Sequence, residues 1–193
     1  MVKKLLLLAV LALALPLAAF ADSSIDISNA GGIVTGNSSG LTLTGSTLFK
    51  YGSSVGSNLG SLSFSTGAFL TGDAANGGTF GAGGTFTISG NGTNGVPNGV
   101  IFSGTFSSGT WSYTTLANGT HVYTLFAGIV NSNGVVGGTS QLTVNTGKGL
   151  FGGSVALSSG DTNLSVPEPG TLSLFGTGLI GLAGMIRRKL SLS

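Results

Sequence analysis

The sequence predicts an all-β fold, a single antiparallel β-sandwich or small barrel, and three observations support this prediction. Short runs that alternate apolar and polar residues recur between turns containing glycine, asparagine or serine, and a period of two is typical of half-buried strands. The 193 residues include 36 glycines and 11 phenylalanines, while charged residues make up only 6%. Aromatic and β-branched residues are depleted in disordered chains, so a folded, glycine-rich β protein is expected.

The body of the chain, residues 22–165, contains about nine predicted strands. They are residues 24–28, 41–44, 62–65, 85–89, 100–106, 110–116, 121–130, 140–146 and 154–157. That many short strands in one domain favour a sandwich or a barrel. A parallel β-solenoid is the alternative, but the repeated Gly-Thr-Phe triplets lack the constant period that a solenoid requires.

The clearest local signal is the pair Asn118-Gly119, which is the preferred sequence for a two-residue type I′ hairpin turn. The cross-strand pairs that this turn predicts are Leu116 with His121, Tyr113 with Thr124 and Trp111 with Phe126. One face would then carry Trp111, Tyr113, Val122 and Phe126, and the other Leu116, Tyr123 and Leu125. Because four large side chains on one face are costly to leave in water, we expect Trp111 to be buried.

The N-terminus has the three parts of a secretory signal peptide. Lys3 and Lys4 precede an unbroken apolar run at residues 5–15, and Ala19 and Ala21 supply the small-x-small cleavage pattern. The apolar run is too short to cross a bilayer core, which needs about 20 residues. We therefore expect signal peptidase to remove the first 21 residues.

The C-terminal segment, residues 166–193, differs in composition from the body. It opens with Val166, Pro167, Glu168 and Pro169. An uncharged apolar run at residues 172–186 follows, and it ends at Arg187, Arg188 and Lys189. The run predicts a transmembrane helix of about 22 Å, and the three cations favour the cytoplasmic side, which leaves the domain outside.

This order of motif, apolar helix and basic tail resembles the PEP-CTERM sorting signal of Gram-negative bacteria, over residues 166–189. The resemblance implies that an exosortase, a membrane cysteine transpeptidase-like enzyme, recognises Pro167, Glu168 and Pro169 and cleaves the chain. It also implies a transient inner-membrane intermediate, followed by delivery to the cell surface or to an exopolysaccharide matrix.

The remaining composition argues against several function classes. Residues 22–165 contain two lysines and four aspartates, a net charge of −2, so no basic patch for nucleic acid is expected. The chain has no cysteine, which excludes disulfides and thiolate metal sites. His121 is the only histidine, Glu168 is the only glutamate, and the aspartates are scattered along the sequence. We therefore expect no catalytic residue, no metal site and no bound cofactor, and predict that the protein is not an enzyme.

Two non-enzymatic roles remain. The first is an exported structural or adhesive protein of the cell surface or extracellular matrix, with exopolysaccharide as a candidate partner. The alternative is a secreted carbohydrate-binding module in which Trp111, Tyr113 or Tyr123 forms an exposed platform for sugar rings. Exposure of these aromatic side chains would favour the second role, and their burial would remove its basis.

Overall fold

The described part of the protein is built from strands alone. The computed structural model describes residues 23–131 and 136–166, and within them it has eleven strands and no helix. The strands are β1 (Ser23–Ala30), β2 (Ile33–Asn37), β3 (Gly40–Tyr51), β4 (Ser54–Ser65), β5 (Phe69–Asp73), β6 (Gly77–Phe80), β7 (Gly83–Asn91), β8 (Asn98–Thr115), β9 (His121–Asn131), β10 (Val136–Asn145) and β11 (Ser154–Val166). The predicted all-β class is confirmed.

No helix in these two ranges is long and apolar enough to cross a membrane. The predicted signal peptide, residues 1–21, and the predicted transmembrane helix, residues 172–186, lie outside the described residues.

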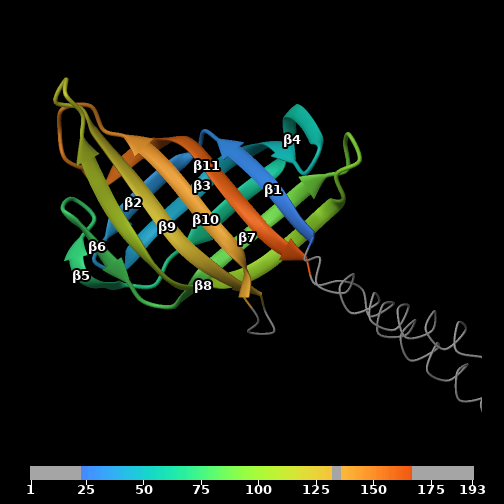
Figure 1. The fold of residues 1–193 in the computed structure, drawn as a ribbon, viewed down its shortest axis with the longest axis horizontal. Helices are drawn as coiled ribbons and strands as arrows, with labels where there is room; N and C mark the ends of the chain where they lie inside the picture. The colour runs from blue at the N-terminus through green and yellow to red at the C-terminus, as the bar shows by residue number, and fades with distance from the viewer. Residues whose placement is uncertain (1–22, 132–135, 167–193) are drawn as a thin grey trace, which may run out of the picture. The chain divides into compact units, whose positions relative to one another are not determined.

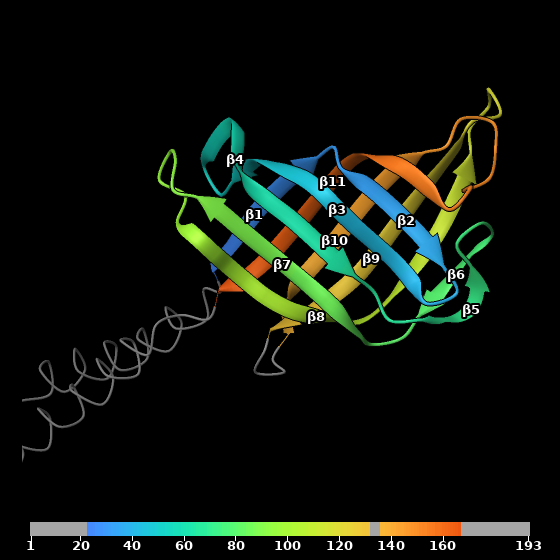
Figure 2. The same cartoon turned by 180° about the vertical axis from the view of Figure 1, so that it is seen from behind.

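The strands form one sheet that closes on itself (Figures 1 and 2). Eight strands follow one another in the order β8-β7-β4-β3-β1-β11-β10-β9, and the first and last of them, β8 and β9, also pair with each other. Pairs along the path from β3 through β4, β7, β8, β9 and β10 to β11 are antiparallel. This closure corresponds to the barrel alternative of the prediction, and antiparallel pairing is inconsistent with a parallel solenoid.

Two short strands, β1 and β2, together occupy the position between β3 and β11 in the closed sheet. Both β1 and β2 pair with β3, and both lie beside β11. The break between them falls at Gly31 and Gly32, which have φ angles of 69° and 80°. A Cβ atom on Gly32 would lie 2.5 Å from the carbonyl oxygen of Thr44, so the backbones approach too closely there for any side chain. These two glycines let one strand position bend without losing its partners.

The interior of the closed sheet is filled with apolar side chains. Along β9, for example, Tyr123, Leu125, Ala127 and Ile129 are buried, while the residues between them face outward. Phe106 contacts the rings of neighbouring phenylalanines edge-to-face, at centroid distances of 5.4–5.8 Å. An eight-stranded closed sheet encloses just enough space for its own side chains, which accounts for this packed core.

Trp111 is the centre of a second aromatic group at one end of the core. Its indole ring stacks on Tyr123 at 5.1 Å and meets Phe151 edge-to-face at 5.7 Å. Its Nε1 donates a hydrogen bond of 2.8 Å to the carbonyl oxygen of Ala74, in the β5–β6 turn. The Tyr123 hydroxyl donates to the carbonyl of Ala75 and accepts from the Phe151 amide. Two loops are therefore tied to the core through two aromatic side chains.

The predicted burial of Trp111 is confirmed, at 1% exposure, but the predicted hairpin register is wrong by one residue. The observed pairs are Trp111 with Leu125, Tyr113 with Tyr123 and Thr115 with His121. A shift of one residue moves a side chain to the opposite face, so Phe126 points outward and is 53% exposed. Trp111 is buried against Tyr123 and Leu125, on the face that the prediction separated from it.

The cause of this shift lies in the turn itself. The amide of Gly119 donates to the carbonyl of Leu116, and the amide of Leu116 donates to the carbonyl of Thr120, both at 2.8 Å. Gly119 has a φ of 81°, whereas Asn118 does not adopt the positive φ that a type I′ turn needs at both central positions. The turn therefore has three loop residues, with the glycine in a bulge, and the additional residue shifts the register.

The seam between β1 and β11 is packed around one glycine. Asn29 is buried and donates from Nδ2 to the Ser46 hydroxyl at 2.7 Å. A Cβ atom on Gly160 would lie 2.4 Å from both Asn29 Oδ1 and Leu142 Cδ2. The absence of a side chain at Gly160 therefore makes room for the buried amide.

Replacing Trp111 with alanine should lower the free energy of unfolding by about 3–5 kcal/mol, because it removes a buried indole ring. Trp111→Phe should cost less, since it keeps an aromatic ring and chiefly leaves the carbonyl of Ala74 without its donor. Urea unfolding followed by circular dichroism measures both values. A loss below about 1 kcal/mol for Trp111→Ala would contradict the central position of this side chain.

Gly160→Ala should destabilise the protein by about 1–3 kcal/mol, because the added methyl group overpacks the seam. Gly149→Ala is the matched control, since a Cβ there meets nothing within 4 Å and its φ is not in the left-handed region. Thermal unfolding of the two variants under the same conditions gives the comparison. Equal melting temperatures would show that the seam accommodates the methyl group.

Candidate functional site

Most of the sequence-predicted site residues lie outside the described part of the chain. These are Ala19 and Ala21 of the signal peptidase site, Pro167, Glu168 and Pro169 of the sorting motif, and Arg187, Arg188 and Lys189 of the basic tail. Val166 is described, and it is the last residue of β11. The sorting motif therefore continues directly from the final strand of the closed sheet.

The aromatic residues proposed as a sugar-binding platform are mostly buried. Trp111 and Tyr123 are 1% and 0% exposed, and their polar atoms bond to loop backbone. Tyr113 is 37% exposed, and its ring packs against Tyr123 at 4.9 Å and His121 at 5.2 Å. The three side chains therefore do not form an exposed platform together.

His121 has a structural environment at the start of β9. Its backbone amide donates to the carbonyl of Gly147, and its carbonyl accepts from the amide of Thr146. These bonds join the β8–β9 hairpin to the β10–β11 loop, and the imidazole lies against the Tyr113 ring. His121 thus lies at a junction between two loops.

The turn between β3 and β4 contains a pattern that is also found in serine hydrolases. Residues 52–56 spell Gly-Ser-Ser-Val-Gly, which matches the nucleophile-elbow pattern of serine hydrolases. That elbow is a turn from a strand into a helix, whereas these residues form the β3–β4 hairpin. The Ser54 hydroxyl donates to the carbonyl of Asn94 at 2.8 Å, so this serine fastens one loop to another.

The described aspartates are scattered along the sequence, but they are not all isolated in the fold. Asp73 accepts hydrogen bonds from the amides of Ala75 and Asn76 and so caps the β5–β6 turn. Asp26 and Asp161, far apart in sequence, interact through their carboxyl groups because β1 and β11 are neighbours. No cluster of three or more histidine, cysteine, aspartate or glutamate side chains occurs in residues 23–131 and 136–166.

The Asp26–Asp161 pair is electrostatically asymmetric because Lys50 contacts only one member. Lys50 Nζ lies 2.5 Å from Asp26 Oδ2, and this hydrogen bond lowers the pKa of Asp26 below its usual value. Burial raises the pKa of Asp161, and the adjacent Asp26 carboxyl adds to the rise. Asp161 therefore retains its proton to higher pH than Asp26 does. The Asp161 side chain also accepts a hydrogen bond of 3.4 Å from the Ser28 hydroxyl.

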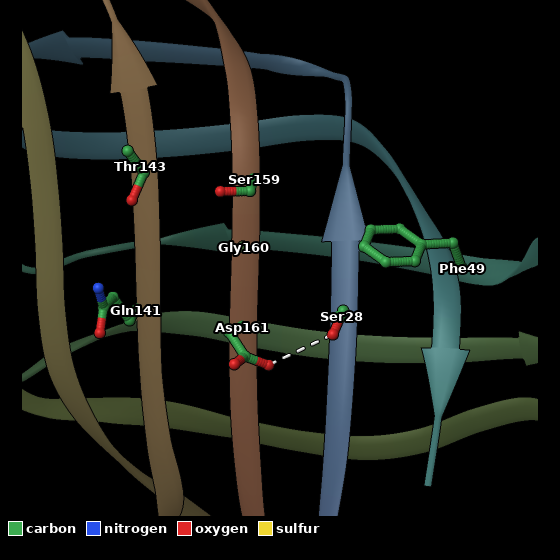
Figure 3. Close-up of a pocket in the computed structure, with 7 residues that line it drawn as sticks. All are labelled: Ser28, Phe49, Gln141, Thr143, Ser159, Gly160 and Asp161. Carbon is green, nitrogen blue, oxygen red and sulfur yellow. Dashed lines mark hydrogen bonds between the residues drawn. The ribbon is translucent and has the colours of Figure 1, made fainter. Parts of the chain in front are cut away.

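Asp161 lies in a hollow on the outer face of the closed sheet, shown in Figure 3. The hollow has a volume of about 280 Å³ and crosses four adjacent strands, β10, β11, β1 and β3. Its side chains come from Ser28, Phe49, Gln141, Thr143, Ser159 and Asp161. Sequence reasoning missed this site, because its members are brought together only by the pairing of the first strands with the last.

Comparison with known proteins bears on the C-terminal segment. The comparison with curated proteins and the comparison with solved structures each return no match. A family model described as the PEP-CTERM protein-sorting motif matches residues 165–189. That range begins within β11, one residue before the described part of the chain ends, and confirms the resemblance read from the sequence. The chain thus carries a PEP-CTERM protein-sorting motif, which implies export and sorting by an exosortase to the cell surface of a Gram-negative bacterium.

Proposed function

We propose that this protein is a structural or adhesive component of the cell surface or extracellular matrix, with a non-catalytic role. The observation that carries the proposal is the sorting motif, which follows the closed sheet directly and implies delivery to the cell surface. The chemical composition of the sheet's outer face supports a structural or adhesive role at the cell surface. That face is rich in hydroxyl and amide side chains and poor in charge.

The outer face presents hydroxyl groups in register across several strands. One such row runs through Ser154, Thr35, Thr42, Ser65 and Thr85, which are direct partners on β11, β2, β3, β4 and β7. Neighbouring strands are about 4.8 Å apart, so the hydroxyls form a closely spaced line. Such a line can exchange hydrogen bonds with polysaccharide hydroxyls or with a neighbouring protein.

Low charge is the second supporting feature. Residues 24–165 carry two lysines and three aspartates, and the ion pair of Lys50 with Asp26 compensates two of these charges. A surface with so few charges brings little electrostatic repulsion to packed neighbours. This suits a molecule that works at high local density in a matrix.

The arrangement of the carboxyl groups supports a non-catalytic role. Glycosidases hold two carboxyl groups about 5 Å or more apart, so that a sugar bond fits between them. Asp26 and Asp161 are near enough to shift each other's pKa, and Lys50 forms an ion pair with Asp26. Asp26 is therefore engaged with a lysine rather than open to a sugar substrate.

We predict that the mature protein begins at Asp22 and ends near Pro169, because signal peptidase and exosortase remove the two flanking segments. The measurement is the intact mass of the protein isolated from surface and matrix fractions of its host. Most mature molecules should lack residues 172–189. Finding those residues on most surface molecules, in a host with an active exosortase, would refute the processing step.

The control is the same host without its exosortase gene. There the protein should keep its C-terminal segment and remain with the inner membrane. Replacing Arg187, Arg188 and Lys189 with neutral residues should also reduce processing, because these cations orient the apolar run. Unchanged processing of that variant would show that orientation does not depend on the basic tail.

A further inference from the structure

We infer that the hollow around Phe49, Gln141 and Asp161 is a binding site for a segment of uncharged polysaccharide. The inference rests on the proposed location of the protein in a polysaccharide-containing matrix and names the site of contact. It differs from the platform predicted from sequence, because it uses none of Trp111, Tyr113 and Tyr123.

Phe49 faces outward from β3 at an irregularity in the sheet. On β1, Ser28 pairs with Lys50 and Asn29 with Leu48, so the register passes over Phe49. The pairing with β4 also passes over it, between Leu48 and Lys50. Phe49 is therefore the additional residue of a β-bulge, and bulges commonly redirect a side chain at a functional site. Its ring is 38% exposed and leans from β3 toward β1 (Figure 3).

The opposite side of the hollow is polar and regularly spaced. Gln141 lies directly opposite Asp161, and Thr143 directly opposite Ser159, on the antiparallel pair β10–β11. Figure 3 shows these four side chains on the same outer face as the Phe49 ring. Gln141 and the two hydroxyls can each donate and accept, and the Asp161 carboxyl adds an acceptor.

A sugar ring matches this combination of surfaces. It has hydroxyl groups at its edge and C–H groups on its faces, so it needs hydrogen-bonding side chains beside an apolar plate. Pockets for small molecules generally combine an aromatic wall with a few placed polar groups. Here Phe49 supplies the wall, while Gln141, Asp161 and the adjacent hydroxyls supply the polar groups.

The charges favour an uncharged chain over an acidic one. No side chain that lines the hollow is a cation. The nearby Lys50 is held by Asp26, and Asp161 presents a carboxyl group to the ligand. An acidic polysaccharide would bring its carboxylates toward Asp161 without a free cation to balance them.

The test is titration of the full-length, ¹⁵N-labelled protein in detergent micelles with three neutral tetrasaccharides, built from glucose, mannose and galactose. Gln141 is the only glutamine in the chain, so its side-chain amide is a direct reporter of the hollow. At least one tetrasaccharide should shift this signal and the backbone signals of Ser159 and Asp161. The absence of shifts there with all three sugars would overturn the inference.

Phe49→Ala should weaken that binding by about tenfold, the value of one aromatic contact. Leu70→Ala is the control, because Leu70 is also a large exposed apolar residue, is more exposed than Phe49, and lies on β5, which contributes no residue to the hollow. Equal losses in the two variants would indicate nonspecific adhesion and contradict the site. Gln141→Ala should also weaken binding, and it provides a second test should Phe49→Ala disturb the fold.

A tetrasaccharide of uronic acids distinguishes the ligand class. It should bind more weakly than the neutral sugars, and tighter binding would overturn the assignment to uncharged polysaccharide. Failure of sugar binding and failure of C-terminal processing can be distinguished, because the two experiments measure different properties. A protein that binds sugar but keeps its C-terminal segment would retain this site while losing the proposed route to the matrix.

Discussion

Closure of the antiparallel sheet is the constraint on which the rest of the structure depends. Once β8 pairs with β9, and β1 and β2 lie between β3 and β11, every strand residue faces either the packed interior or the outside. The interior holds most of the large apolar side chains, and the outside carries hydroxyls, amides, few charges and scattered apolar residues such as Phe49 and Phe126. Closure also gives each strand of the path from β8 to β9 a partner on both sides, which leaves β5 as the edge strand of the described sheet and limits pairing with other chains. A protein with so little charge to keep molecules apart has particular need of that protection.

The sequence was sufficient for the class of fold but not for its register. Alternation along the chain predicts strands well, because it reflects burial on one side of each strand. The position of the Asn118-Gly119 turn was also evident, yet its geometry was not, because the same dipeptide fits loops of two or three residues. Two backbone hydrogen bonds of Leu116, one from the Gly119 amide and one to the Thr120 carbonyl, define the three-residue loop. Trp111 was correctly expected to be buried, but its cross-strand partner is Leu125 instead of Phe126, and its ring stacks on Tyr123.

The hollow could not be predicted, for two physical reasons. Asp161 and Ser28 are 133 residues apart, and only pairing of the first strand position with the last brings them together. Phe49 would read as an ordinary member of a β-strand, because a bulge leaves no mark in an alternation of apolar and polar residues. By contrast, the sorting motif is a local signal that depends on residue order alone. This explains why it was recognised from the sequence although most of it lies outside the described residues.

The strands of the closed sheet and the sorting segment occupy successive parts of the chain. All the strands of the closed sheet precede Pro167, and β11 ends at Val166. Removal of the segment that follows therefore takes away none of the described strands and breaks no pairing among them. The hollow depends on β1, β3, β10 and β11, all of which remain after such a cut. An exosortase can then act on the tail of a domain that is already folded, and the domain can reach its destination with its described strands intact.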